Sequence, residues 1–324
     1  MYLPLPVIIE VWLAMKLSVV SPVYMGEEVL VALVERLISA LSKADYGFEI
    51  VLVDDGSPDR SWEVISSLSR QFHQIRAIRL SRNFGQHVAI TAGLDVAEGD
   101  VIVVMDCDLQ DQPEEVPALV DELNNSECVD CVIALRKIRR DGFSKRLGSR
   151  VFYWLLNLLT GMELDSRAAN FGAYSRQMID QILKMREPDR SFPFCVHWVG
   201  FKRKYLEVAH APRHAGVTSY TFYKLLKLAV AIGMGVSDRP MRIVMGVGAG
   251  LSVSSFLLGL LVLFRYFLGY IAEPGYASLV LSIWFFSGVI ILFIGFVGLY
   301  VGRIFLASKS RPLYVTYKPE HKNP

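Results

Sequence analysis

The chain reads Val104-Met105-Asp106-Cys107-Asp108-Leu109-Gln110-Asp111-Gln112-Pro113-Glu114 where an apolar strand, expected over residues 100–105, ends. Side chains that follow a strand at the carboxyl edge of an open α/β sheet project into the crevice where ligands bind. Asp106 and Asp108 offer two carboxylates there. Mg²⁺ and Mn²⁺ prefer such oxygen donors and usually share them with substrate phosphates. The other interpretation is an acidic loop that leads into a helix.

Strands and helices alternate on both sides of this stretch. β-rich runs occur at residues 17–23, 49–54, 75–80, 101–105 and 131–135, with helical patterns between them at residues 27–43, 61–72, 88–97 and 114–124. The alternation predicts an α/β domain with a Rossmann-like, mostly parallel sheet and helices on both faces. No glycine-rich phosphate cradle of a dinucleotide oxidoreductase or P-loop ATPase follows the first strand. Diphosphate binding through a metal at Asp106 and Asp108 is therefore the better account.

Two long uncharged segments, residues 243–264 and 274–302, lie toward the C-terminus. Each is long enough to cross a hydrocarbon core of roughly 30 Å as a helix. They predict a hairpin of two transmembrane helices, at about residues 243–266 and 276–302. The outer flanks carry the basic residues Arg239, Arg242, Arg303, Lys309, Arg311 and Lys318. The positive-inside rule then places both ends and the N-terminal domain in the cytoplasm, as in a multi-pass protein of the inner membrane.

The expected organisation has five parts. They are an apolar extension at residues 1–14, a cytoplasmic domain at 15–217, an amphipathic interface helix at 218–238, the two transmembrane helices within 239–306 and a cytoplasmic tail at 307–324. The extension lacks a basic segment and is too short to span a membrane, and Met15 is an alternative start. The net charge of +2 does not indicate nucleic-acid binding. Cys128 and Cys131 form half a zinc motif without a second pair, so free thiols are expected.

Acidic side chains also follow the second strand, in Val53-Asp54-Asp55-Gly56-Ser57. Carboxylates at this position can accept hydrogen bonds from a base or a ribose. The structural interpretation is a turn in which Asp or Ser caps the next helix. Both interpretations can hold together.

These motifs occur in an order that resembles the inverting family 2 glycosyltransferases of the GT-A fold. The set comprises Val20-Ser21-Pro22-Val23-Tyr24 with Glu27, the Val53 to Ser57 run, Arg82-Asn83-Phe84-Gly85 and the Asp106 to Glu114 run. With the C-terminal hairpin it is similar to the polyprenyl-phosphate branch, which includes dolichyl-phosphate-mannose synthase-like and undecaprenyl-phosphate glycosyltransferases. The resemblance covers nearly the whole chain from Leu17 onward.

The resemblance implies roles for individual residues on the donor side. Nucleotide contacts are expected from Pro22, Tyr24, Glu27, Asp54 and Asp55. Asp106 and Asp108 would bind the Mg²⁺ or Mn²⁺ that bridges the diphosphate, with Gln110 assisting. Arg213, in a segment similar to the family's Arg-x-x-Gly-x-Ser-x-Tyr, would clamp a phosphate.

A basic segment at residues 136–150 precedes the apolar run at residues 151–159. Such donors suit an anionic lipid phosphate at the level of the headgroups. The resemblance nominates Arg136, Arg146 and Ser149 for the acceptor phosphate. The alternative is nonspecific attraction to anionic lipid. Residues 151–159 and 220–234 are expected as helices at the membrane interface.

The chain departs from the family at Asn170-Phe171-Gly172, where relatives often carry Asp-Phe-Arg. An alcohol acceptor would need a base at the first position. A phosphate monoester, with a second pKa of about 6, is already largely ionised. Asn170 is therefore compatible with a phosphate acceptor, and Asp165 is an alternative base. Because Gly172 removes a basic contact, the choice of donor can differ from that of the best-known relatives.

The sequence thus predicts inverting transfer of one sugar from a nucleotide sugar to undecaprenyl (polyprenyl) phosphate at the cytoplasmic membrane face, for cell-envelope glycan or lipopolysaccharide modification. Membrane lipids are expected partners, and paired hairpins are compatible with a homo-oligomer. Three alternatives stay open. A polysaccharide synthase would carry Gln-x-x-Arg-Trp, whose Gln and Arg are missing before Trp198. A glycerolipid glycosyltransferase differs only in its acceptor, and a non-enzymatic scaffold would not bind nucleotide with Mn²⁺.

Overall fold

The computed structural model describes residues 15–44, 46–136, 157–158, 168–187, 190–209, 239–268 and 275–317. The chain divides into two compact units. One contains the sheet together with the segment that starts at Pro312, and the other contains the long C-terminal helices up to Arg311.

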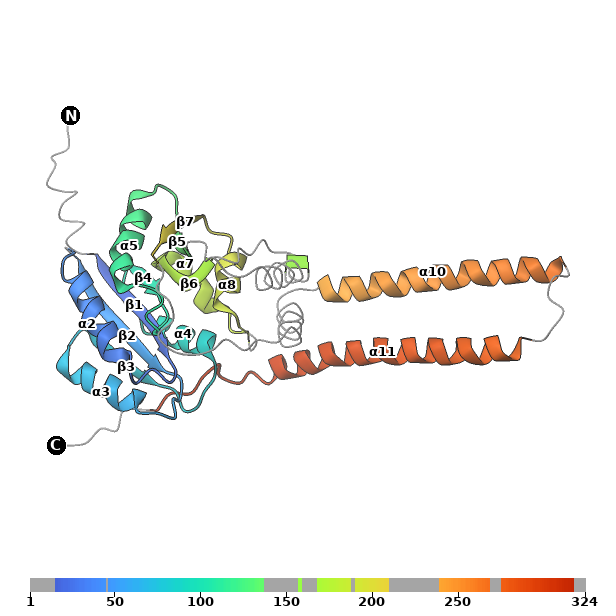
Figure 1. The fold of residues 1–324 in the computed structure, drawn as a ribbon, viewed down its shortest axis with the longest axis horizontal. Coiled ribbons are helices and arrows are strands. Elements are labelled where there is room, and N and C mark those ends of the chain that lie inside the picture. The colour runs from blue at the N-terminus through green and yellow to red at the C-terminus, as the bar shows by residue number, and fades with distance from the viewer. Residues whose placement is uncertain are drawn as a thin grey trace, which may run out of the picture. The chain divides into compact units, whose positions relative to one another are not determined.

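The sheet unit contains seven strands and six α-helices among the described residues (Figure 1). The strands are β1 (Lys16–Val23), β2 (Gly47–Asp54), β3 (Ile75–Arg79), β4 (Val101–Val104), β5 (Cys131–Arg136), β6 (Ala168–Ser175) and β7 (Arg203–Val208). The helices are α2 (Leu30–Leu41), α3 (Ser61–Gln71), α4 (Gln86–Leu94), α5 (Val116–Asn125), α7 (Arg176–Lys184) and α8 (Phe192–Trp198), and a 3-10 turn, η1 (Pro113–Glu115), precedes α5.

The strands lie in the order β3-β2-β1-β4-β6-β5-β7. β3, β2, β1 and β4 are parallel to one another, and β5 is parallel to β7. Among these seven strands, β6 alone runs antiparallel to its neighbours, β4 and β5. The predicted α/β class with a mostly parallel sheet is confirmed. Because β2 and β4 lie on opposite sides of β1, the crevice beyond the carboxyl ends of β1 and β4 is a topological switch point, where open α/β sheets bind ligands.

Alternation of side chains along the strands explains how both faces of the sheet are covered. Leu17 and Val19 of β1 pack into the main core, which also contains the buried faces of α2, α3 and α5. Val20 points to the other face, where α4 lies so close that a Cβ added at Gly93 would be 2.4 Å from its Cγ1. Helix α4 is buried from Val88 to Leu94, so its N-terminal end is held rigidly beside the switch point.

The C-terminal segment returns to the sheet unit and extends it at the β3 edge. Thr316 forms an antiparallel bridge with Leu80. The Ser81 N–H donates to the Val315 carbonyl at 2.8 Å, and the Tyr314 hydroxyl donates to Asp95 at the end of α4 at 2.7 Å. The sequence predicted only a cytoplasmic tail here.

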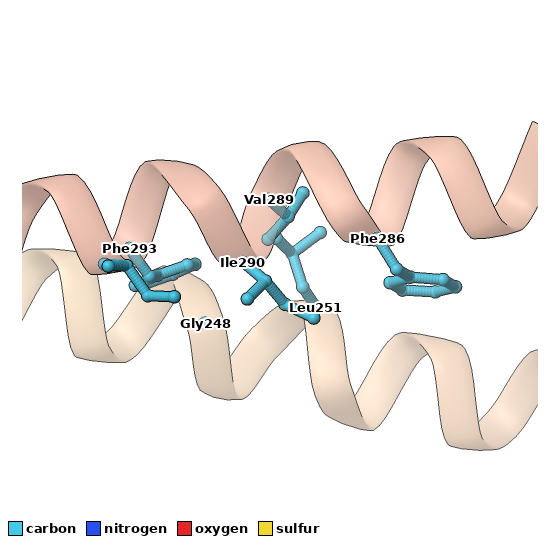
Figure 2. Close-up of a pocket in the computed structure, with 7 residues that line it drawn as sticks. Gly248, Leu251, Phe286, Val289, Ile290 and Phe293 are labelled. Atoms are coloured by element: carbon cyan, nitrogen blue, oxygen red, sulfur yellow. The ribbon is translucent and has the colours of Figure 1, made fainter.

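The described part of the second unit contains α10 (Arg239–Phe267), α11 (Tyr276–Ser308) and the short helical stretch at residues 157–158. The two helices pack where a Cβ added at Gly248 would lie 2.9 Å from the Phe293 ring. Figure 2 shows Phe286, Val289, Ile290 and Phe293 of α11 facing Gly248 and Leu251 of α10 along an apolar groove. The absence of a side chain at Gly248 lets the aromatic ring approach the α10 backbone.

The prediction of two membrane spans is supported in part. In the described ranges, residues Ser282–Ser308 form the one helical stretch long and apolar enough to cross a membrane. Met241–Leu251 of α10 is a shorter apolar stretch. The extension at residues 1–14 and the interface helix at 218–238 lie outside the described residues, as does the run at 151–159 apart from residues 157–158, which are helical.

Candidate active site

The two predicted metal-binding aspartates lie directly beyond β4, at the switch point. Asp106 and Asp108 are both half-buried. The Gln110 backbone N–H and side-chain Nε2 donate to the two carboxylate oxygens of Asp108 at 3.1 and 2.8 Å. The Gln86 Nε2, from the first residue of α4, donates to Asp106 Oδ1 at 2.5 Å. Both carboxylates are therefore oriented by glutamine amides.

The backbone of this loop is strained at Leu109, which has φ 59° although it is not a glycine. Its side chain is buried in the main core, which holds the loop in this conformation. Left-handed backbone at a non-glycine residue is uncommon and tends to occur at functional sites. The turn carries the chain from Asp108 to the buried Gln110, whose amide then faces the carboxylate.

The donor set fits a divalent cation that arrives with a substrate. No group of three or more His, Cys, Asp or Glu side chains suited to a metal occurs in the part of the chain that the structure describes. Mg²⁺ is commonly held by one or two carboxylates and completed by waters and substrate phosphates, so Asp106 and Asp108 suffice as the protein's share. Gln110 contacts Asp108 through its amide nitrogen, which orients that ligand.

Cys107, between the two aspartates, carries a partly buried thiol. Burial, and next the neighbouring Asp106 carboxylate, raise the pKa of this thiol to about 12. The thiol is therefore protonated at neutral pH, and a hard cation such as Mg²⁺ prefers the carboxylate oxygens beside it. The role of Cys107 is to pack against the β1 side of the crevice, because a Cβ added at Gly26 would lie 3.6 Å from its sulfur.

The predicted nucleotide residues of β2 are buried and hydrogen-bonded to backbone. The Asp55 side chain accepts the Phe84 N–H at 2.7 Å and the Gly85 N–H at 2.9 Å, one with each oxygen. Asp54 accepts the Ser57 N–H at 3.1 Å and lies 3.7 Å from the Arg79 guanidinium. Burial raises the pKa of both carboxyls, and the hydrogen bonds oppose that shift. In this arrangement Asp55 fixes the loop before α4.

The loop after β2 also needs a glycine. Gly56 has φ +64°, and a Cβ there would lie 2.4 Å from the Arg82 carbonyl carbon. The β2 and β3 loops therefore approach each other through backbone contact, which only glycine permits. This explains why the run from Val53 to Ser57 and the run from Arg82 to Gly85 lie together at one edge of the sheet.

The predicted residues of β1 have different surroundings. Pro22 is buried in the strand, paired with Val53 of β2. Tyr24, just beyond the strand, is 48 % exposed and is available to a ligand in the crevice. Glu27 accepts the Arg60 N–H at 3.1 Å and so ties the start of α2 to the start of α3.

On the acceptor side the structure places Asn170 on β6, half-buried. β6 is antiparallel to β4 with Gly172 opposite Val104. Asp106 follows Val104 by two residues and Asn170 precedes Gly172 by two residues. Because the two strands are antiparallel, both residues lie at the same edge of the sheet. Gly172 has no room for a side chain, because a Cβ there would lie 2.8 Å from the Val132 carbonyl oxygen.

The remaining predicted residues, on the acceptor side and at the donor phosphate clamp Arg213, lie at the end of β5 or outside the described residues. Arg136 is the last residue of β5. Arg146, Ser149, Asp165 and Arg213 lie outside the described residues. The structure thus brings together Asp54, Asp55, Asp106, Asp108 and Asn170 along one sheet edge. The sequence patterns did not point to Gln86, although its position directly after Arg82-Asn83-Phe84-Gly85 was a signal for it.

A carboxylate pair at the switch point of a mostly parallel α/β sheet is compatible with a glycosyltransferase. The chain belongs to glycosyl transferase family 2, whose model matches residues 18–207. The family predicted from the motifs is confirmed.

Relatives match along almost the whole chain. The undecaprenyl-phosphate 4-deoxy-4-formamido-L-arabinose transferase of Pectobacterium atrosepticum is 36% identical over 304 residues, 93% of this chain and 92% of the relative. The uncharacterized glycosyltransferase YkcC of Bacillus subtilis is 34% identical over 302 residues, 93% of each chain. A solved glucosyl-3-phosphoglycerate synthase from Mycobacterium tuberculosis, in complex with Mn²⁺, UDP and phosphoglyceric acid, is 19% identical over 69% of this chain and 80% of that chain, with a TM-score of 0.48.

Proposed function

We propose that this protein transfers a single sugar from a nucleotide sugar to a polyprenyl phosphate, with inversion at the anomeric carbon, at the cytoplasmic face of the inner membrane. The observation that carries the proposal is the similarity to undecaprenyl-phosphate sugar transferases, which extends over 93% of this chain and so includes both the sheet and the apolar helices. A similarity restricted to the sheet would not indicate which molecule accepts the sugar.

In the proposed reaction an oxygen of the lipid phosphate forms a bond to C1 of the sugar while the bond from C1 to the nucleoside diphosphate breaks. The nucleoside diphosphate leaves with the bonding electron pair. Asp106 and Asp108 would hold a Mg²⁺ or Mn²⁺ ion, which would neutralise the charge that grows on the departing diphosphate. Tyr24 would contact the nucleotide in the crevice, and Asp55 would shape it through the loop before α4.

Asn170 supports a phosphate acceptor. Its neutral amide lies at the sheet edge that carries Asp106, where an acidic residue would serve as a base for an alcohol. A phosphate monoester with a second pKa of about 6 carries its charge before it reacts. It needs orientation rather than deprotonation. Arg136, Arg146 and Ser149 are the residues proposed to contact the lipid phosphate, and Arg213 is proposed to clamp the donor diphosphate.

The membrane part of the proposal rests on the sequence and on α11. Two spans, with basic residues outside their outer ends, would keep the catalytic unit on the cytoplasmic side, beside its lipid substrate. The long apolar stretch Ser282–Ser308 supports at least one span. Paired hairpins would allow a homo-oligomer, and the product would serve cell-envelope glycan or lipopolysaccharide modification.

The full chain, purified in detergent, would be incubated with Mn²⁺, undecaprenyl phosphate and a panel of radiolabelled UDP- and GDP-sugars, with diacylglycerol as a parallel acceptor. We expect one nucleotide sugar to label undecaprenyl phosphate and no label in diacylglycerol. Label in diacylglycerol alone would replace the proposal by a glycerolipid glycosyltransferase. Absence of Mn²⁺-dependent nucleotide binding would favour the scaffold.

The Asp108→Asn variant tests the metal assignment within this reaction. The amide keeps the size of the side chain but removes the charge that a divalent cation needs. We expect the transfer rate to fall by orders of magnitude, because the charge on the leaving group would then lack its counterion. Near-normal turnover in this variant would refute the assignment of Asp108.

A further inference from the structure

One contact of the candidate site has no counterpart in the motifs that define it. Gln86 and Asp106 are 20 residues apart in the chain, and their side chains meet at 2.5 Å between Nε2 and Oδ1. An ionised carboxylate only accepts hydrogen bonds, and a glutamine amide nitrogen only donates them. The pair is therefore a charge-assisted hydrogen bond, which is roughly twice as strong as a neutral one.

Gln86 is held in place by the backbone on which it stands. It is the first residue of α4 and follows Gly85, whose φ of +98° sets the entry into the helix. Both N–H groups just before it, those of Phe84 and Gly85, bind the buried Asp55 carboxylate. Beyond it, α4 is buried against the sheet. The exposed Gln86 side chain therefore extends from a rigidly held backbone toward Asp106.

The same geometry restrains the Asp106 carboxylate. One oxygen receives the Gln86 amide, which restrains the rotation of the carboxylate about its last bond. Loss of this contact would leave the carboxylate less restrained, so that it would lose more rotational freedom when it binds a cation.

We propose that Gln86 is a positioning residue for Asp106, which it prepares for a divalent cation. The inference rests on the proposed function, because it takes Asp106 and Asp108 as the cation's ligands. Partners that orient metal ligands typically change metal affinity by about 10–100-fold when they are lost. Since Gln86 is exposed and acts on one of two carboxylates, we expect the lower end, a roughly tenfold weaker Kd.

The test measures Mn²⁺ binding to the full chain in detergent, with UDP at the same concentration in every sample, from the electron paramagnetic resonance signal of free Mn²⁺. Gln86→Met keeps the length of the side chain and removes the donor. Gln71→Met is the matched control, since Gln71 is an exposed glutamine at the far end of α3, about 15 Å along that helix from its N-terminus. We expect Gln86→Met to raise the Kd for Mn²⁺ about tenfold and Gln71→Met to leave it unchanged.

Two further measurements separate this inference from a structural role and from the proposed function. Because one hydrogen bond is lost, the thermal midpoint of metal-free Gln86→Met should fall by no more than roughly 2–4 °C; a larger fall together with weaker binding would mean that Gln86 supports the fold, and would overturn the inference. If Asp108→Asn loses Mn²⁺ and Gln86→Met binds as the wild type does, the inference alone fails. If Asp108→Asn binds Mn²⁺ normally, the metal site of the proposed function fails and the inference fails with it.

Discussion

The buried Asp55 carboxylate should hold the site together even when no ligand is bound. It accepts two backbone N–H groups from the loop before α4, at 2.7 and 2.9 Å, and is 2 % exposed. In Asp55→Asn the amide oxygen can accept one of these N–H groups, while the new NH₂ group faces the other. The variant therefore loses one hydrogen bond to a charged acceptor and leaves a buried donor without a partner.

The size of the effect follows from those contacts. A buried donor left unsatisfied costs about 1–3 kcal/mol. Part of this cost is offset because the neutral amide is easier to bury than the carboxylate, whose pKa burial raises. We expect a net loss of about 1–2 kcal/mol. For a domain of this size that corresponds to a thermal midpoint lower by roughly 2–8 °C.

The assay is thermal unfolding of the ligand-free full chain in detergent, followed by the loss of sheet and helix signal. Asp180→Asn is the matched control, because Asp180 is exposed and its ion pair with Arg176, at 3.7 Å on the surface of α7, contributes little to stability. We expect its midpoint to change by less than half as much. A wild-type midpoint in Asp55→Asn, with UDP binding lost, would refute the reasoning and would leave Asp55 as a ligand contact alone.

Three further variants or reactions test the structure around the site. Gly93→Ala places a methyl group 2.4 Å from a valine of β1 and should destabilise the sheet unit by about 1–3 kcal/mol in denaturant unfolding, whereas Gly47→Ala, with open space around its Cβ, should be near neutral. Tyr314→Phe removes the hydroxyl that donates to the aspartate ending α4, and should lower the thermal midpoint by roughly 2–4 °C through the loss of about 1 kcal/mol; an unchanged midpoint would show that the C-terminal segment is not anchored there. A maleimide at pH 7.5 should label the exposed Cys128 and spare the partly buried Cys107, whose pKa of about 12 keeps it protonated, and rapid modification of Cys107 in the folded chain would contradict that raised pKa.

Local patterns of the sequence were sufficient to predict most of the sheet. Strands β1 to β5 lie close to the ranges expected from apolar runs, because the two-residue period of a buried strand and the longer period of a helix are written in neighbouring residues. The same patterns did not predict that the antiparallel β6 would be inserted between β4 and β5. The position of β6 depends on which strand edges are left open once the parallel strands have packed.

The candidate site was predictable in its location and less so in its contacts. Asp54, Asp55, Asp106 and Asp108 were expected at one edge because the carboxyl ends of parallel strands meet there. That Asp55 would bind the loop before α4 could not be foreseen, since the partner N–H groups lie about 30 residues away in the chain. The sequence does not distinguish an acidic side chain that contacts a ligand from one that binds backbone N–H groups.

The sequence by itself determined the α/β class, the family and the carboxylate pair at the end of β4, because each is encoded in short runs with a fixed spacing. Only the tertiary structure decided that Gln86 would meet Asp106 across 20 residues and that Thr316 would pair with Leu80 across most of the chain. The physical reason is the same in both cases. Contacts between distant segments form only where packing of the whole unit brings their backbones together. The local periodicity of hydrophobic residues does not predict such contacts.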